Sequence, residues 1–294
     1  MTRGFLLIAL GHPYYGNYAF NLAASILAYN PDAKISVVVS YGVLSHLRAS
    51  QVAMFDQLIE CPKEAMTYLD GVSYVKPKLY AFDLSPYDET ILLDVDVCWC
   101  PNVSVSDVFD SLSYSKFQIK NTGHYDVISD KRIDNPKYTY WNDPKEICRH
   151  FNIKDKLYCC QGEFIYFDKS NISRLIFRKS IEVFDKSKMG TSTKFAGLSM
   201  NDEFAFNVAL AQVKYQMPKS PYTPTFWAYL DGFKMTRTDI HLKYMAVSAG
   251  GTSVGHITES HYNDIIGNAY RKIGLQYKPF RFIQKSSFLP ERRK

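Results

Sequence analysis

The sequence lacks any apolar run long enough to cross a membrane. Its first apolar stretch, Phe5 to Leu10, is interrupted at once by Gly11-His12-Pro13, whereas a membrane-spanning helix needs about 20 apolar residues. The same stretch is too short for the apolar segment of a secretory signal peptide. We therefore expect a cytoplasmic protein without a transmembrane segment.

The chain also lacks the cysteine patterns of zinc modules and of secreted disulfide scaffolds. Its six cysteines include a Cys98-x-Cys100 pair and an adjacent Cys159-Cys160 pair. Neither pair has the spacing that zinc knuckles use between ligands. We therefore predict reduced thiols.

Two common nucleotide-binding loops are absent as well. The first predicted strand, residues 5–10, leads into a glycine-bounded loop, residues 11–17, where many α/β proteins receive a nucleotide. That loop contains no G-x-G-x-x-G pattern, no Lys-Ser/Thr after Gly16, and no Lys or Arg. These absences disfavour dinucleotide-dependent enzymes, P-loop enzymes and sugar nucleotidyltransferases.

The composition is that of an ordinary globular protein, with 46% hydrophobic and 22% charged residues. The formal net charge is +6, and part of this excess lies in the basic C-terminal tail, residues 271–294. Such a tail suits nucleic acid or an anionic membrane, although a solvated basic end explains it equally well. The charge alone therefore identifies no partner.

Short apolar runs alternate with helical patterns along the chain, which predicts an α/β fold with a mixed, mostly parallel central sheet in a single domain. We expect the domain at residues 1–270. The predicted strands are 5–10, 35–39, 91–97, 161–167 and 244–247. The predicted helices are 20–27, 44–60, 76–82, 106–112 with Ser106 as cap, 144–151 with Asp143 as cap, 171–184, one opening at 201–207, and one around 261–265.

Residues 113–160 contain several turn signals and few regular patterns, among them Asn121-Thr122-Gly123 and Asp134-Asn135-Pro136. Long irregular segments in a compact domain are often functional loops. We therefore predict an irregular insertion that recognises the acceptor of a reaction.

The run Ile91–Val97 resembles a buried strand and yet contains two carboxylates, Asp94 and Asp96. Alternate residues of a strand point to the same face, so both side chains are expected to project together. A divalent cation is the simplest compensation for their repulsion, because hard metals take oxygen ligands. The alternative is structural: the second aspartate ends the strand and the first caps a turn. Spacing alone does not decide between these two interpretations.

Other charged residues also admit two interpretations. Lys76 and Lys78 lie near the start of a short predicted helix, where each either holds a phosphate or faces water. Asp202 and Glu203 open a later helix, where acids simply complement the helix dipole. Tyr18 offers a ring to a base, although packing is the more common role for tyrosine.

Taken in order, these motifs resemble the GT-A glycosyltransferases, in particular the glycogenin and lipopolysaccharide-galactosyltransferase family. The most specific block contains Lys78-Leu79, Tyr87, Leu92-Leu93-Asp94-Val95-Asp96 and Asp107-Val108-Phe109. Further on, Gln161-Gly162-Glu163 resembles the family's Asn-x-Gly strand motif, and Asn201-Asp202-Glu203 resembles its later acidic motif. The similarity covers about residues 4–265 in short ordered motifs.

The resemblance implies a Rossmann-like GT-A fold and a hexosyl- or pentosyltransferase that uses a nucleotide-diphosphate sugar, with UDP preferred and with retention of configuration. It implies Mn²⁺ or Mg²⁺ held by Asp94, Asp96 and His256. The family's C-terminal His-Gly pattern is not reproduced, and His256 is preferred to His261 as the third ligand.

The resemblance also assigns two groups of substrate-contacting residues. The donor-binding residues are Tyr18, Lys78, Asp94 and Val95, and the catalytic residues are Asp202, Gln161 and Glu203. The acceptor stays open among a glycan, a protein hydroxyl and a modified base in DNA. A competing hypothesis is a non-catalytic basic module that binds nucleic acid or a membrane through a glycosyltransferase-like core.

Overall fold

A computed structural model describes residues 1–69, 71–134, 139–189, 191–192, 199–218, 223–226, 240, 243–248 and 256–279. Contacts divide the chain into two compact units, each assembled from separate stretches. Unit 1 comprises residues 1–60, 85–114 and the described part of 219–288, and unit 2 comprises residues 61–84 and 115–218. The boundary between a domain at 1–270 and a basic tail stays a prediction.

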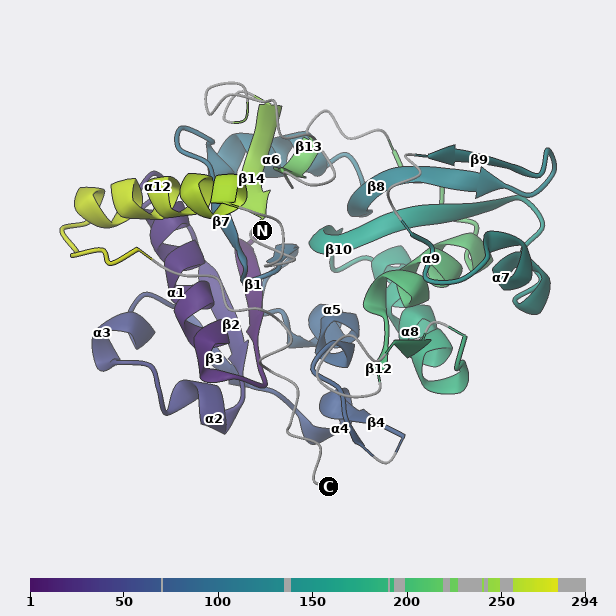
Figure 1. Cartoon of the computed structure of the whole chain (residues 1–294), viewed down its shortest axis with the longest axis horizontal. Coiled ribbons are helices and arrows are strands. Elements are labelled where there is room, and N and C mark those ends of the chain that lie inside the picture. The colour runs from purple at the N-terminus through teal and green to yellow at the C-terminus, as the bar shows by residue number, and fades with distance from the viewer. Residues whose placement is uncertain are drawn as a thin grey trace. The chain divides into compact units, whose positions relative to one another are not determined.

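Unit 1 contains a parallel sheet in the order β3-β2-β1-β6 (Figure 1). Its strands are β1 (Arg3–Ala9), β2 (Ile35–Val39), β3 (Gln57–Glu60) and β6 (Glu89–Leu93). Helix α1 (Pro13–Leu27) joins β1 to β2 and starts after the cap His12, whose ring accepts a hydrogen bond from the Tyr14 amide. The predicted β-α-β entry is confirmed.

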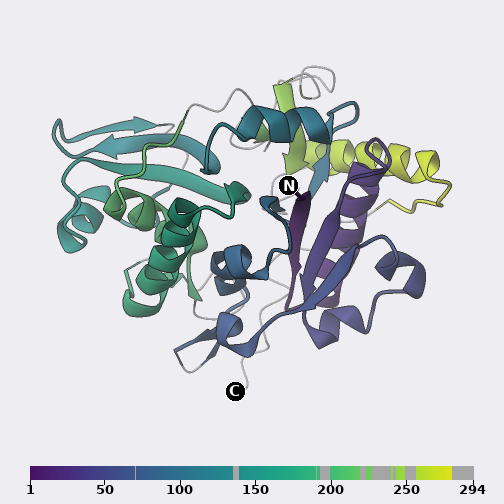
Figure 2. The ribbon, with the colours of Figure 1, turned by 180° about the vertical axis from the view of Figure 1, so that it is seen from behind.

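The C-terminal helix α12 (His256–Lys272) packs against α1, and both views show the two helices together (Figures 1 and 2). Asn21 of α1 donates a hydrogen bond to Tyr262 over 3.2 Å and accepts one from Tyr270 over 2.6 Å. A small sheet of β13 (Thr223–Phe226), β14 (Tyr244–Ser248) and β7 (Val97–Trp99) completes the regular structure with α6 (Val105–Leu112).

Two predicted features of unit 1 are wrong. The predicted helix at 44–60 is absent: α2 (Tyr41–Leu44) ends where it should begin, and α3 (Ala49–Val52) and β3 follow. Pairing with β2 overrides the helical pattern there, since tertiary hydrogen bonds outweigh local propensity. Helix α6 is capped by Ser104, whose hydroxyl accepts from the Asp107 amide, and not by Ser106.

Unit 2 contains an antiparallel sheet in the order β10-β8-β9, made of β8 (Phe117–Asp126), β9 (Lys131–Asp134) and β10 (Lys156–Asp168). Helices α8 (Asn171–Lys186) and α9 (Asp202–Gln212) pack together, and α9 lies on β10. Their core is aromatic: the ring of Phe177 contacts those of Phe117 and Phe206 at 5.8 and 5.5 Å. The helical pattern of residues 171–184 predicts that Leu175 faces inward with Ile176, but Leu175 is exposed because it lies on the outer side of α8.

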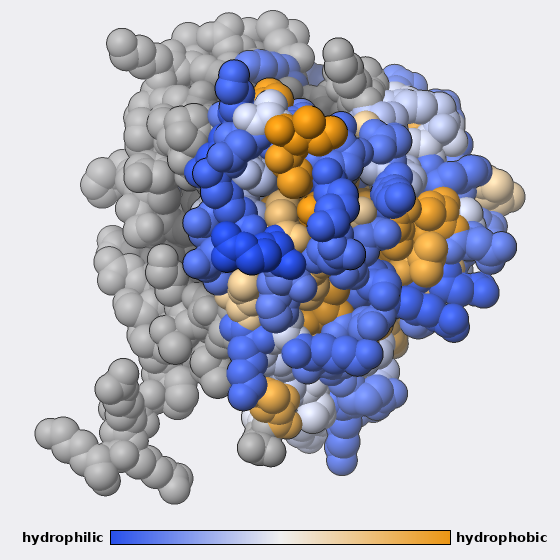
Figure 3. Space-filling view, turned by 90° about the vertical axis from the view of Figure 1, so that its right-hand side faces the viewer, coloured by the Kyte–Doolittle hydropathy of each residue, from blue (hydrophilic) through white to orange (hydrophobic). Residues whose placement is uncertain are grey.

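The smaller elements of unit 2 are α4 (Lys63–Met66), β4 (Thr67–Tyr68), β5 (Gly71–Val72), the 3₁₀ helix η1 (Lys76–Tyr80), α5 (Ala81–Leu84), α7 (Pro144–His150), β11 (Thr191–Ser192) and β12 (Ser199–Met200). Asp143 caps α7, as predicted. The coloured part of the face in Figure 3 is mainly hydrophilic, with apolar side chains in small separate groups.

The prediction of an irregular insertion at 113–160 is wrong, because this segment contains β8, β9, α7 and the start of β10. The apparent turn Asn121-Thr122-Gly123 lies inside β8. At Gly123, where φ is +142°, a Cβ would lie 2.3 Å from the Asp134 Cβ. The glycine therefore marks a close approach between two strands. A role in acceptor recognition stays a prediction.

All six cysteines are buried free thiols, as predicted. Burial raises the pKa of each, and for Cys61 the pKa rises to about 12. Within the described part of the chain, no helix combines the length and apolarity that a bilayer crossing needs.

Candidate active site

The predicted carboxylate pair lies in a turn of unit 1. Strand β6 ends at Leu93, and the Val97 amide donates to the Asp94 carbonyl over 3.3 Å before β7 begins. Val95 is buried, whereas Asp94 and Asp96 are half-buried. The prediction of a continuous strand through residues 91–97 is therefore wrong, and the joint projection of the two side chains stays a prediction. Ending the strand early buries the apolar residue and leaves both carboxylates accessible at its carboxyl end, where α/β proteins bind ligands.

The two carboxylates suit Mn²⁺ or Mg²⁺, which often binds one or two protein carboxylates and takes further ligands from water or substrate phosphates. No group of three or more His, Cys, Asp or Glu side chains arranged for a metal ion occurs among the described residues. His256 opens α12, and its side chain lies outside the described part of the structure. His261, the alternative ligand, is half-buried on the same helix. The third ligand stays a prediction.

Tyr18 lies in the interior of α1 with 4% of its surface exposed, and its ring packs edge-on against Tyr262 at 6.2 Å. Burial raises its pKa, and the negative charge of Asp96 adds to the shift. The more accessible ring on this helix belongs to Tyr14, which stacks on His12 at 5.2 Å. Contact between Tyr18 and a base stays a prediction.

A second cluster lies in unit 2 at the start of α9. Asn201 caps this helix by accepting hydrogen bonds from the amides of Glu203 and Phe204. The adjacent Asp202 is buried, and its Oδ2 lies 3.2 Å from the Lys78 Nζ of η1. The helix dipole favours an acid here, but an exposed acid would satisfy the dipole equally. The burial of Asp202 and its ion pair with Lys78 therefore indicate a role beyond helix capping.

Gly162 of β10 brings the strand against this carboxylate. A Cβ at position 162 would lie 2.4 Å from the Asp202 Oδ2, which is closer than atoms approach without displacement. The Gly162 amide also donates to the Glu203 Oε1 over 3.1 Å. Space therefore requires glycine at this position, whereas the backbone hydrogen bond would be open to any residue except proline.

Glu203 is held on both oxygens, because its Oε2 accepts from the Trp141 indole over 2.7 Å. Burial, and after it the neighbouring Asp202 charge, raises the pKa of Glu203 to about 8 against the opposing effect of the two hydrogen bonds. Trp141 adopts φ +67°, a left-handed conformation uncommon for a bulky residue. Sequence reasoning missed Trp141, since no local pattern indicates a contact with a residue so far along the chain.

Gln161 is buried beside Gly162 and opposite Lys120 in the strand register, and its side-chain amide donates to the Cys160 carbonyl over 3.1 Å. Sequence reasoning also missed the buried ion pair between Lys120 and Glu163, whose charged atoms are 2.8 Å apart. The structure thus brings Asp202, Glu203 and Lys78 together in unit 2, while Gln161 precedes Gly162 on β10 and bonds to the Cys160 carbonyl.

Lys76 does not take either of the two roles open to it from the sequence. Its ammonium is buried, lies 2.8 Å from the Asp185 carboxylate and donates to the Thr67 carbonyl over 2.8 Å. The charge of Lys76 is therefore neutralised within unit 2, where it joins η1 to α8.

Solved structures similar to this chain include glycosyltransferases of the GT-A fold. The complex of the galactosyltransferase LgtC with donor and acceptor sugar analogues has a TM-score of 0.53 at 16% identity, over 94% of this chain and 97% of LgtC. The glycosyltransferase GlyE of Streptococcus pneumoniae has a TM-score of 0.51 at 13% identity, over 96% of this chain and 67% of GlyE. The bifunctional glycosyltransferase WbbM has a TM-score of 0.54 at 12% identity over 93% of this chain, which spans about half of WbbM (51%).

No protein-family model and no curated protein sequence matches the chain. The structural matches confirm the predicted GT-A fold and its mixed α/β architecture. At these identities they show the fold alone.

Proposed function

We propose that the protein is a glycosyltransferase that moves a sugar from a nucleotide-diphosphate sugar, with UDP as carrier, to an acceptor hydroxyl. The observation on which this proposal rests is the carboxylate cluster of unit 2, where Asp202 and Glu203 are held against Gly162 by Lys78 and Trp141. The GT-A fold supports the same conclusion. Buried carboxylates retained with so many specific contacts indicate chemistry beyond fold stability.

The turn after β6 supplies the donor side of the proposed reaction. Asp94 and Asp96, with His256, would hold Mn²⁺ or Mg²⁺, and the bound ion would neutralise the diphosphate as it leaves. Val95 places the two carboxylates by burying its own side chain in the turn. In this proposal Tyr18 contacts the base, and Lys78 holds the Asp202 carboxylate within unit 2.

The cluster of unit 2 would act on the sugar itself. Glycosyl transfer passes through a centre with oxocarbenium character, which an ion-paired carboxylate such as Asp202 stabilises electrostatically. Because the pKa of Glu203 is raised to about 8, its carboxyl retains a proton at neutral pH and can donate a hydrogen bond to a sugar hydroxyl. Gln161 supplies a further polar group. We propose retention of configuration, since this arrangement supports the centre without requiring a base.

We propose a glycan hydroxyl as acceptor, in keeping with the acceptor sugar analogue named for the LgtC complex. A protein hydroxyl and a modified DNA base are the alternatives. The basic tail is described only to residue 279, and there Lys272 lies over the Tyr29 ring at 4.2 Å. Nothing in that described part favours nucleic acid.

The proposed function is tested by incubating the wild-type protein with a panel of UDP- and GDP-sugars and Mn²⁺, and measuring release of the nucleoside diphosphate with and without EDTA. We expect release from a UDP-sugar that EDTA abolishes. Absence of release with every donor would contradict the proposal and favour a non-catalytic binding module. Release unaffected by EDTA would contradict the role of the metal.

A further inference from the structure

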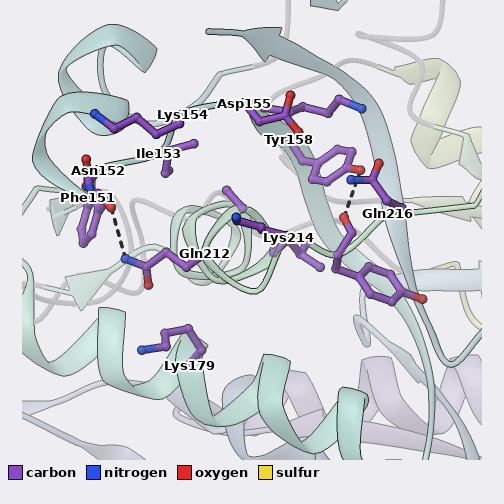
Figure 4. Close-up of a pocket in the computed structure, with 14 residues that line it drawn as sticks. Phe151, Asn152, Ile153, Lys154, Asp155, Tyr158, Lys179, Gln212, Lys214 and Gln216 are labelled. Atoms are coloured by element: carbon purple, nitrogen blue, oxygen red, sulfur yellow. Dashed lines mark hydrogen bonds between the residues drawn. The ribbon is translucent and has the colours of Figure 1, made fainter.

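Unit 2 contains a pocket of about 570 Å³ at the opposite end of α9 from Asp202 (Figure 4). Residues 151–156 and Tyr158 form one wall, and residues 210–212 and 214–216 form another. Lys179 of α8 completes the lining. The volume is within the range of small-molecule sites, about 300–1,000 Å³.

The walls of this pocket are fixed by two helix ends. After α7, Asn152 adopts φ +54° and the Ile153 amide donates to the Cys148 carbonyl over 2.9 Å. After α9, Lys214 adopts φ +53° and the Tyr215 amide donates to the Leu210 carbonyl over 3.0 Å. Both helices therefore end in hydrogen-bonded left-handed turns, which define the backbone of the walls.

Two anchored tyrosines form part of the lining. The Tyr158 hydroxyl donates to the Tyr215 carbonyl over 3.1 Å and accepts from the Met217 amide over 3.2 Å. The Tyr215 hydroxyl donates to the Phe117 carbonyl over 2.8 Å. Because both hydroxyls are engaged inside the protein, both rings are fixed. The half-buried Tyr215 offers more surface to a ligand than Tyr158, which is 5% exposed.

The rim of the pocket is basic. Four lysines and one acid line it, namely Lys154, Lys156, Lys179, Lys214 and Asp155. Glu182 pairs with Lys179 at 2.6 Å, which leaves three lysines against Asp155. The dipole of α9 favours Lys214 at its C-terminal end, but Lys154 and Lys156 belong to no helix. The excess charge therefore favours an anionic ligand.

We propose that this pocket binds an acidic oligosaccharide, as a subsite for the part of the acceptor that lies away from the reacting hydroxyl. Apolar rings suit the C–H face of a sugar, the Gln212 and Gln216 amides suit its hydroxyls, and the lysines suit carboxylate or sulfate groups. From Asp202 to Gln212 the helix rises about 15 Å, at roughly 1.5 Å per residue. This inference rests on the proposed function, because it assigns the site to the acceptor.

Binding is measured by fluorescence anisotropy with a labelled sulfated tetrasaccharide, against a neutral tetrasaccharide and a single-stranded DNA of equal charge. We expect the sulfated probe to bind and Lys154→Glu with Lys214→Glu to weaken it by about tenfold or more. Ala211→Trp, which fills the pocket without changing charge, should weaken binding as well. The matched control is Lys63→Glu with Lys131→Glu, two exposed lysines outside the pocket, and should change affinity less than about twofold.

Equal losses in the two double variants, or no effect of Ala211→Trp, would overturn the pocket as the binding site. The carbohydrate assignment would be overturned if the DNA bound wild-type protein as tightly as the sulfated probe does and lost affinity in the same pocket variants. Donor hydrolysis without acceptor, measured in parallel, separates the two proposals. The subsite is supported if the pocket variants still hydrolyse the donor but no longer bind the probe. If the wild-type protein binds the probe but hydrolyses no donor, only the proposed transferase activity is contradicted.

Discussion

At the scale of single residues, the contact between Gly162 and Asp202 gives the sharpest prediction. Gly162→Ala would place a methyl group 2.4 Å from the Asp202 Oδ2. We expect the carboxylate to move, with a loss of unfolding free energy of about 1–3 kcal/mol and a fall in donor turnover of about 100-fold. Urea unfolding and the rate of UDP release measure the two effects.

Gly42→Ala is the matched control, because a Cβ there meets no atom within 4 Å. Stability and turnover close to wild type are expected for the control. An active Gly162→Ala protein would show that the position of Asp202 against β10 is unimportant for the reaction.

Glu203 gives a prediction about pH. A glutamate normally titrates near 4.5 and Glu203 near 8, so the folded protein keeps this proton to higher pH than the unfolded chain. The stabilisation is complete below pH 4.5 and is lost as pH rises to about 8. Glu203→Gln should therefore flatten the fall of Tm between pH 5 and pH 8.

Glu146→Gln, a change at an exposed glutamate of α7, should leave the pH dependence of Tm as in wild type. A Glu203→Gln protein whose Tm falls with pH as steeply as wild type would contradict the buried, proton-bearing state of this carboxyl.

At the scale of elements, the start of α6 gives a test of which serine caps this helix: the sequence predicts Ser106, and the structure shows Ser104. Ser104 accepts a hydrogen bond from the Asp107 amide, whereas Ser106 lies inside the helix and is exposed. Ser104→Ala should lower the unfolding free energy by about 1 kcal/mol. Ser106→Ala should change it by less than about 0.5 kcal/mol, and urea titration compares them. Equal losses would contradict the capping assignment.

The elements best predicted from sequence are those with strong local signals. Three features could be predicted because each depends on neighbouring residues: the apolar run at β2, the cap Asp143 of α7 and the helical pattern of α8. The hairpin of β8 and β9 was not, since its turn-like residues include Gly123, whose role is a close approach to Asp134. Local rules mistook that strand for a loop.

At the scale of the whole molecule, the GT-A fold was predictable from short motifs that resemble those of the family and follow one another along the chain. The structural matches confirm this fold. For the candidate site, the sequence indicated which residues take part but not which of them pair with one another. The pairing of Lys78 with Asp202 and the support of Glu203 by Trp141 join positions 124 and 62 residues apart (202 − 78 and 203 − 141). Such pairings depend on tertiary packing, and no spacing rule reveals them.

The proposal that the turn after β6 binds the donor while the cluster of unit 2 acts on the sugar is tested by two measurements on the same variants. UDP binding with Mn²⁺ is measured by titration calorimetry, and UDP-sugar turnover by the rate of UDP release. Asp94→Asn with Asp96→Asn should lose UDP binding, and Asp202→Asn should retain binding while losing turnover. Asp32→Asn with Asp83→Asn, two exposed acids, is the control and should behave as wild type. Binding and turnover at wild-type levels in both site variants would contradict the account.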